Sequence, residues 1–412
     1  MSANHEPLHV ALIGTGNRAQ TIYTPLFNAL EPWIKVVAVC DPVAQNANAL
    51  AEKLGVPAYH SLRKLVEDRP MEAAIVVTPI DSHHSISCYL SQNGVHNLVE
   101  TTMASTLVQG RQMVATAKKN NVELRIAENF FRYPFDRMAK LIADSDVLGP
   151  IKRLTCFHDH LGYHNNSRWI HFFGNVPESV QAIRHTMPTA PHRQGGQYAH
   201  RFHQDEKFEA RFLRFPDGVL VSDIAGNIKG MLVRYPRPGY TEFDGGRGTI
   251  VQYATSNWRG EGEVRYCSDE ALLGGGVHDH VFPIEHHSKD GVWSSSTVNL
   301  PTGKLEYVNQ FANAKLDHNR DFYGAAVMGH IVDFAQAVQG VATSEYSADD
   351  ALIAMMIESG ARLSARRDGE IIRLPMDGED EADQVELADL RARHGVDPLD
   401  VEAMLAISYP RP

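Results

Sequence analysis

One short stretch of the chain concentrates side chains that can accept or donate a proton near neutral pH. His158, Asp159, His160, Tyr163 and His164 fall within seven residues. On an extended segment His158 and His160 point to the same side, and His164 follows one helical turn after His160. The ordinary imidazole pKa of about 6.5 suits histidine to general acid–base catalysis. We therefore expect His164, His160 and Tyr163 to be catalytic candidates and His158 to contact a substrate.

The same histidine spacing could also hold a metal ion, because imidazole is a common transition-metal ligand. A second group of possible ligands occupies residues 278–287, with His278, Asp279, His280, Glu285, His286 and His287. Neither group has cysteine partners or a recognised ligand motif, so we expect no metal site.

Two other segments could contact the hydroxyl groups of a substrate. Tyr198 and His200 follow Gly195-Gly196, and a solvated loop is the alternative interpretation of that segment. Arg168 lies on the helix expected after His164, beside an apolar run that starts at Trp169. We include Tyr198, His200 and Arg168 among the expected substrate contacts.

A glycine-rich turn near the start of the chain has the spacing of a dinucleotide-binding loop. The apolar run Val10–Ile13 has the length of a buried strand and leads into Gly14-Thr15-Gly16-Asn17-Arg18-Ala19. In this Gly-x-Gly-x-x-Ala form, the first glycine makes the tight turn and the second lets the backbone approach a pyrophosphate. The alanine keeps the following helix close, so that its N-terminus faces the phosphates. The whole turn is expected to bind the cofactor.

Asp41 ends the second apolar strand, about 20 residues beyond these glycines, where the fold places a carboxylate on the ribose 2′-hydroxyl. A turn residue before Pro42 is the alternative interpretation. Because a carboxylate there would repel a 2′-phosphate, we expect NAD rather than NADP. NADP remains the alternative cofactor, since Arg18 in this loop could contact a phosphate.

Composition limits the class of protein. The 412 residues carry a formal net charge of -11, with 43% hydrophobic and 22% charged residues. This predicts two globular domains and argues against a nucleic-acid partner or an anionic membrane. The N-terminus lacks the pattern of an export signal, and the four scattered cysteines fit reduced thiols, so we expect a cytoplasmic location.

The pattern of apolar residues changes midway along the chain. From residue 8 to about 127 short strands alternate with helices, which predicts a doubly wound parallel sheet. Later strands are separated by hairpin-type turns such as Pro216-Asp217-Gly218, which predicts a mainly antiparallel open sheet. We expect an α/β Rossmann domain (1–130), an α+β substrate and oligomerisation domain (131–375), and an acidic helical extension (376–412). The extension could pack on the body or on a neighbouring subunit.

Expected helices cover residues 44–54, 62–67, 85–92, 109–120, 135–144, 166–173, 322–339 and 348–366. Expected strands cover 10–13, 34–40, 73–77, 96–99, 122–127, 151–158, 208–215, 219–224, 248–253, 263–267 and 370–374.

Several local motifs, most of them at the ends of expected strands, resemble those of the glucose–fructose oxidoreductase and inositol dehydrogenase (Gfo/Idh/MocA) superfamily. They are the Gly14 turn, Cys40-Asp41-Pro42, the Thr-Pro-x-x-x-His segment 78–83, the run 93–100, and Glu128-Asn129 with Arg132 and Pro134. The resemblance runs from about His9 to Pro375. It implies cofactor contacts at Thr78, Pro79, His83, Glu100, Thr101 and Asn129, and a homo-oligomer that pairs its open sheets.

The chain departs from the family pattern where chemistry is expected. The family's catalytic lysine falls at Thr101, while His164 falls on its catalytic histidine and His160 on its aspartate. We therefore expect an NAD(P)-dependent oxidoreductase that takes hydride from a secondary alcohol of a sugar, cyclitol or related polyol. An NAD-using glycosidase or lyase is the first alternative, because relatives of that kind also lack the lysine. A non-catalytic nucleotide-binding sensor or partner subunit is the second.

Overall fold

The N-terminal half is built on a six-stranded parallel sheet. The computed structural model describes residues 6–157, 162–193, 202–226, 239–254, 261–314, 322–376 and 381–407. The strand order is β3-β2-β1-β4-β5-β6, which is the doubly wound order of dinucleotide-binding domains. The strands are β1 (Leu8–Ile13), β2 (Ile34–Cys40), β3 (Ala58–Tyr59), β4 (Ala73–Val76), β5 (His96–Val99) and β6 (Leu124–Ile126). Their helices are α1 (Phe27–Leu30), α2 (Ala44–Leu54), α3 (Leu62–Asp68), α4 (Ile80–Gln92) and α5 (Leu107–Lys119).

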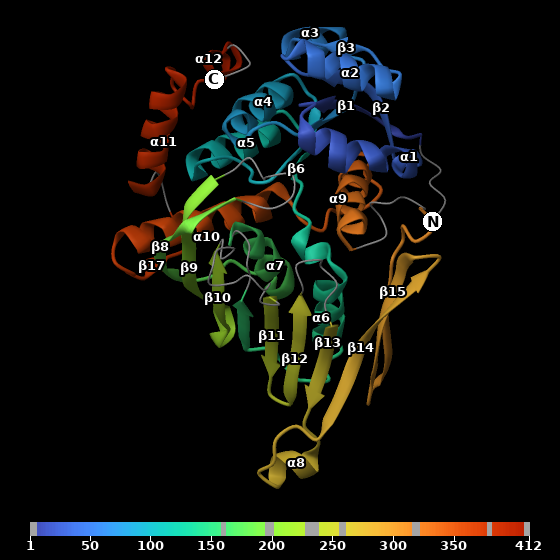
Figure 1. Cartoon of the computed structure of the whole chain (residues 1–412), viewed down its shortest axis with the longest axis vertical. Helices are drawn as coiled ribbons and strands as arrows, with labels where there is room; N and C mark the ends of the chain where they lie inside the picture. The colour runs from blue at the N-terminus through green and yellow to red at the C-terminus, as the bar shows by residue number, and fades with distance from the viewer. Residues whose placement is uncertain are drawn as a thin grey trace.

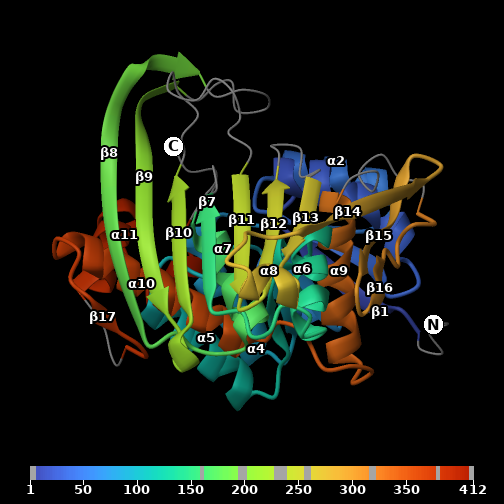
Figure 2. The same ribbon diagram turned by 90° about the horizontal axis from the view of Figure 1, so that it is seen from below.

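The second half is built on an eleven-stranded open sheet (Figure 2). Its order is β16-β15-β14-β13-β12-β11-β7-β10-β9-β8-β17, and only β7 and β10 pair in parallel. The strands are β7 (Arg153–Phe157), β8 (Ser179–Arg193), β9 (Phe202–Arg214), β10 (Leu220–Gly226), β11 (Gly239–Gly245), β12 (Gly248–Ala254), β13 (Glu261–Tyr266), β14 (His280–Lys289), β15 (Val292–Leu300), β16 (Gly303–Val308) and β17 (Ile372–Arg373). The two sheets confirm the expected fold class.

Helices fill the space behind the open sheet (Figures 1 and 2). They are α6 (Pro134–Asp144), α7 (Tyr163–Phe173), α9 (Phe322–Val338) and α10 (Ala348–Arg366). Helix α10 packs on β8, α7 and α5, so it joins the two halves of the molecule. A continuous apolar cluster runs through this junction, from strands of the parallel sheet to Trp169 of α7 and Ile357 of α10.

Several strands of the open sheet were not expected from the sequence: β8, β11, β14, β15 and β16. Strand β8 contains Pro188 and Pro191, and proline disfavours a strand because it cannot donate to the ladder. The structure accommodates the prolines at an irregularity, where the register with β9 shifts between Pro188 and His192. Four expected helices begin earlier than predicted: α4 at Ile80, α5 at Leu107, α6 at Pro134 and α7 at Tyr163.

The C-terminal segment packs on the nucleotide half of its own chain. It forms α11 (Glu381–His394) and α12 (Val401–Leu405), which lie beside α4 and α5 in Figure 1. Asp383 is fully buried and accepts hydrogen bonds from the backbone N–H groups of Leu107 (3.0 Å) and Val108 (2.9 Å) at the start of α5. Asp81 forms ion pairs with Arg393 at 2.7 Å and His394 at 2.9 Å. The C-terminal extension therefore packs on the body of its own chain.

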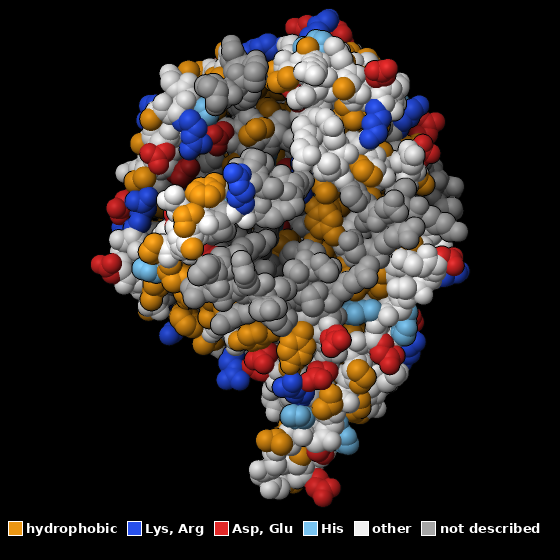
Figure 3. Space-filling model, in the orientation of Figure 1, with side chains coloured by type: hydrophobic (Ala, Val, Ile, Leu, Met, Phe, Trp, Pro, Cys, Tyr) orange, Lys and Arg blue, Asp and Glu red, His pale blue; other side chains and the backbone are white. Residues whose placement is uncertain are grey.

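Exposed apolar side chains lie on the open sheet and on the projection around α8 (Asp269–Leu273), seen at the bottom of Figures 1 and 3. Leu273 at the tip is 90% exposed, and Ile183 and Val308 on the sheet are 61% and 62% exposed. Such side chains suit a protein contact, and homo-oligomerisation stays a prediction. All four cysteines are free thiols. Within the described ranges, no helix is long and apolar enough to cross a membrane.

Candidate active site

The glycine-rich turn has one glycine that the protein fold requires and one that it does not. Gly14 has a φ of +88°, and a Cβ there would lie 2.4 Å from the carbonyl oxygen of Val77. At Gly16 an added Cβ would meet no described atom within 4 Å. Packing within the chain therefore does not explain Gly16. A glycine at this position instead leaves room for a ligand, such as the pyrophosphate of a dinucleotide, to approach the protein backbone.

Asp41 is bound to this turn. One carboxylate oxygen accepts from the backbone N–H of Thr15 at 2.8 Å and from the Thr15 hydroxyl at 3.0 Å. The other accepts from the N–H of Val43 at 2.8 Å. The carboxylate thus lies at the carboxyl ends of β1 and β2, the position from which this fold binds a ribose.

Arg18 extends away from Asp41 toward the end of β5. Its guanidinium forms an ion pair with Glu100 at 2.6 Å and donates to the hydroxyl of Tyr323 at 2.7 Å. Glu100 also accepts from Tyr23 (2.8 Å) and from the backbone N–H of Thr101 (2.9 Å). Burial by itself would raise the pKa of Glu100, but the Arg18 charge outweighs it and lowers the pKa. Arg18, the cationic side chain of the turn, is therefore held in an ion pair with Glu100. This pair lies next to Thr101, the position at which the family pattern has lysine.

His83 connects the two loops that follow β4 and β5. Its ring is fully buried, with Nε2 2.8 Å from the carbonyl oxygen of Thr78 and Nδ1 2.8 Å from that of Thr102. This arrangement positions the two loops and leaves no exposed ring edge for a ligand. Thr78 and Pro79 lie on the rim of the first loop and are partly exposed, whereas Asn129 is buried.

Tyr163 and His164 begin α7 and face the nucleotide half. The His164 ring stacks on Phe130 with centroids 4.3 Å apart and an interplanar angle of 6°, and it lies 4.0 Å from the Tyr163 ring. Thr101 lies close enough to Tyr163 to influence the pKa of its hydroxyl. Burial lowers the pKa of His164 to about 3 and raises that of Tyr163. The structure therefore brings Glu100, Thr101, Tyr163 and His164 together.

Buried ion pairs fix the orientation of α7. Arg168 is 3% exposed and forms a two-pronged pair with Asp136, at 2.7 and 2.9 Å. The guanidinium of Arg168 is thus part of the packing between α6 and α7, and its placement corrects the expectation of a substrate contact. Arg211 pairs with Asp223 at 2.6 Å and donates to the carbonyl oxygen of Gly162, which fixes the first turn of α7.

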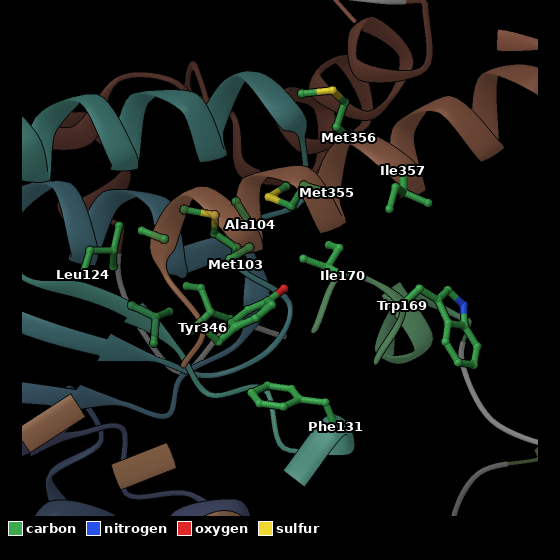
Figure 4. Close-up of a cluster of buried hydrophobic side chains, with 14 of the residues drawn as sticks. Met103, Ala104, Leu124, Phe131, Trp169, Ile170, Tyr346, Met355, Met356 and Ile357 are labelled. Carbon is green, nitrogen blue, oxygen red and sulfur yellow. The ribbon is translucent and has the colours of Figure 1, made fainter. Parts of the chain in front are cut away.

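A cavity of about 510 Å³ lies next to the start of α7. Its lining includes Thr102, Glu128, Tyr163, Lys207, Glu358 and Arg362. Its apolar wall includes Met103, Ala104, Tyr346 and Met355, which Figure 4 shows in one cluster, with Phe131 drawn below them. The volume lies within the range of small-molecule sites, and the mixture of apolar wall and few charges is typical of them.

Glu128 is the residue of this site that the sequence analysis did not select as a site residue. It follows β6 and is 5% exposed, and its carboxylate lies 3.5 Å from Nδ1 of His164 and 3.3 Å from the hydroxyl of Ser167. Burial raises the pKa of its carboxyl to about 8. A carboxyl at the carboxyl end of a parallel strand was the available signal, since ligands bind at that edge.

Four expected site residues, His158, His160, Tyr198 and His200, lie outside the described residues. Among the described ones, no group of three or more side chains is placed to hold a metal ion. His286 and His287 instead contact the hydroxyls of Ser296 (2.7 Å) and Thr297 (2.8 Å) on the neighbouring strand.

Comparisons with known proteins agree with this fold. A glycosyl hydrolase family 109 protein from Streptomyces coelicolor is 29% identical over 199 residues, which cover 46% of this chain and 41% of that protein. A D-glucoside 3-dehydrogenase from Escherichia coli is 30% identical over 114 residues, which cover 27% and 32%. Each match thus spans less than half of the relative's length.

Solved structures match over nearly the whole chain. Levoglucosan dehydrogenase, in complex with NADH and levoglucosan, has a TM-score of 0.66 at 16% identity and covers 90% of this chain and all of its own. An NAD-binding oxidoreductase from Klebsiella pneumoniae has a TM-score of 0.67 at 17% identity, with the same coverage. At these identities the likeness shows a shared fold.

The family model described as "Oxidoreductase family, NAD-binding Rossmann fold" matches residues 8–128, the part of the chain that contains the Gly14 turn, Asp41 and Glu100. This match confirms the expected class of cofactor. Residues 8–128, which contain these motifs, therefore match the NAD-binding part of this oxidoreductase family, and the chain shares the two-sheet fold of the solved oxidoreductases.

Proposed function

We propose that the protein is an NAD-dependent oxidoreductase that acts on a secondary hydroxyl of a sugar, cyclitol or related polyol. One observation carries the proposal. Proton-transferring side chains of the open-sheet half, Tyr163 and His164, meet the end of β5 beside a cavity of substrate size. The dehydrogenase relatives, which act on sugars according to their names, support the substrate class.

The Gly14 turn, Asp41, Thr78 and the Glu100-Thr101 segment would hold the cofactor, and the open space at Gly16 fits its pyrophosphate. When bound, NAD accepts a hydride from the carbinol carbon or returns one to a carbonyl. Asp41 would orient the adenosine ribose. The ion pair with Arg18 lowers the pKa of Glu100 and keeps its carboxyl ionised. The carboxylate would therefore accept a hydrogen bond from a neighbouring hydroxyl.

The chain itself supplies orientation and proton transfer. Phe130 and Tyr163 hold the His164 ring between them, so its nitrogen atoms have fixed directions. Burial keeps His164 neutral at working pH, which leaves it able to accept a proton from a substrate hydroxyl. Tyr163 and the cavity wall would exclude water from the reacting oxygen.

The test is incubation of the protein with NAD and a panel of sugars and polyols. Growth of the reduced-nicotinamide absorbance band with one substrate class supports the proposal. Tight NAD binding with no reaction on any substrate would favour a sensor or partner subunit instead.

A second candidate is an NAD-using glycosidase or lyase, in which oxidation of a ring carbon is transient and a leaving group departs by elimination. Two observations favour it: Thr101 stands where the family has lysine, and one relative is a glycosyl hydrolase by name. Release of an aglycone from aryl glycosides, with no net change in reduced nicotinamide, would support this candidate against the first.

A further inference from the structure

Glu128 is a buried carboxyl side chain without a compensating cation. Within the described parts of the chain, its one contact with a basic side chain is with His164, and no lysine or arginine pairs with it. The other buried carboxyls nearby differ: Asp136 is paired with Arg168, and Glu100 with Arg18. An unpaired buried carboxyl favours its neutral form, because burial penalises the charge.

The charged groups around Glu128 reinforce this preference. Glu100, after β5, is negative and raises the pKa of Glu128 further, beyond the effect of burial. His164 and Tyr163 on α7 are neutral at pH 7, and so is Tyr346 before α10, because burial shifts the pKa of each away from neutrality.

Five further charged side chains line the same cavity: Asp81, Lys207, Glu358, Arg362 and Glu386. Glu358 on α10 is paired with Arg184 at 2.6 Å, and Arg362 lies 4.0 Å from Glu386. Lys207 on β9 is exposed and makes no ion pair within the described residues. None of these cations forms a contact with the Glu128 carboxyl.

His164 connects Glu128 to the place where a substrate hydroxyl would lie. When Glu128 is neutral, its O–H can donate to Nδ1, and the ring then carries its proton on Nε2. When Glu128 is ionised, Nδ1–H donates to the carboxylate, and Nε2, which carries no proton in this tautomer, can accept one. The 3.5 Å separation is long for such a bond, as is common before a substrate is bound.

We propose that Glu128 stores the proton of the reaction: the proton of the substrate hydroxyl moves through His164 onto its carboxylate, and returns by the same route. This rests on the proposed function. In the oxidation direction the substrate O–H bond breaks and an N–H bond forms at Nε2, while the Nδ1 proton passes to Glu128. The O–H electron pair stays on the substrate oxygen and becomes part of the new carbonyl bond, and the hydride leaves the carbon for the cofactor.

This arrangement predicts opposite pH dependences for the two directions. Oxidation requires ionised Glu128, so its rate should rise as the pH passes about 8, and carbonyl reduction requires the neutral acid, so its rate should fall there. Glu128→Gln should lower both rates by about 10²-fold or more and remove the inflection. Glu128→Asp, which keeps a carboxyl, should restore a pH-dependent rate.

The protonation state is measured separately from activity. Infrared difference spectra between acidic and alkaline pH should show the carbonyl band of a carboxylic acid that disappears as the pH passes about 8. The band should be missing in Glu128→Gln and present in Glu386→Gln, a control that removes a half-exposed carboxyl from the same cavity. Absence of the band from the natural protein at pH 6, or its survival in Glu128→Gln, would overturn the inference.

A second readout is stability. Because the Glu128 pKa is raised from 4.5 to about 8, the natural protein binds one more proton folded than unfolded in that window. Its melting temperature relative to Glu128→Gln should therefore fall as the pH rises from 4.5 to 8, and a constant difference would contradict the inference. If the carboxylic-acid band titrates but no sugar or polyol reacts, the proposed function is wrong, whereas the neutral state of the Glu128 carboxyl is confirmed.

Discussion

Removal of the Asp41 carboxylate tests the cofactor assignment most directly. A carboxylate has about four acceptor positions, and Thr15 N–H, the Thr15 hydroxyl and Val43 N–H use three of them. One position remains for a ribose hydroxyl. The loss of one charge-assisted hydrogen bond costs about 1.5–3 kcal/mol. Asp41→Ala should therefore weaken NAD binding by about 10- to 150-fold.

NADP should respond differently to the same change. Its 2′-phosphate gains nothing from the carboxylate and is repelled by it, so Asp41→Ala should leave NADP binding unchanged or improve it. Titration calorimetry with both nucleotides at one ionic strength gives the ratio of the two affinities. Glu52→Ala, an exposed carboxylate on α2, controls for the change in net charge. A natural protein that prefers NADP, or an unchanged ratio in Asp41→Ala, would refute the reasoning.

The remaining predictions concern the turn, the catalytic histidine and assembly. Gly16→Ala should keep the melting temperature and weaken NAD binding, whereas Gly14→Ala should lower the melting temperature, because only its Cβ meets the Val77 carbonyl; equal behaviour in thermal melts and calorimetry would contradict this. His164→Asn should lower turnover by about 10²–10⁴-fold with NAD affinity retained, and equal steady-state rates would remove His164 from the mechanism. Light scattering at micromolar concentration should show a dimer or larger, and a monomer would count against pairing through the open sheet.

The nucleotide half could be predicted from the sequence in detail because its signals are local. Strands β2 and β5 and helix α2 have the expected bounds, since apolar periodicity and end signals such as Gly55 lie within the element or directly beside it. Helix α7 was expected from Asn166 because Tyr163 and His164 show no helical periodicity. Burial against Phe130 and the Arg211 contact extend it to Tyr163, and both contacts are distant in sequence.

The candidate site could be predicted only where a motif marks the residue. The Gly14 turn and Asp41 lie at the expected strand ends, and His164 lies close enough to Glu100 and Arg18 for their charges to affect its pKa. The sequence does not predict that Asp136 pairs with an arginine while Glu128 does not. The difference depends on which side chains lie together in the folded chain. Arg168 was assigned to a substrate for the same reason, since its partner Asp136 lies 32 residues away on another helix.

The contact of Asp383 with the start of α5 has a consequence for synthesis on the ribosome. The nucleotide half ends near residue 128, but the acceptor of the Leu107 and Val108 N–H groups lies 276 and 275 residues later in the chain, respectively. In a Rossmann half that emerges first, Thr106 can already cap α5 through the N–H of Gln109, but the N–H groups of Leu107 and Val108 lack this acceptor until Asp383 has left the exit tunnel. Final consolidation of the cofactor-binding half should thus follow synthesis of the segment that carries Asp383, and a chain that stops before Asp383 should remain a better target for chaperones and proteases.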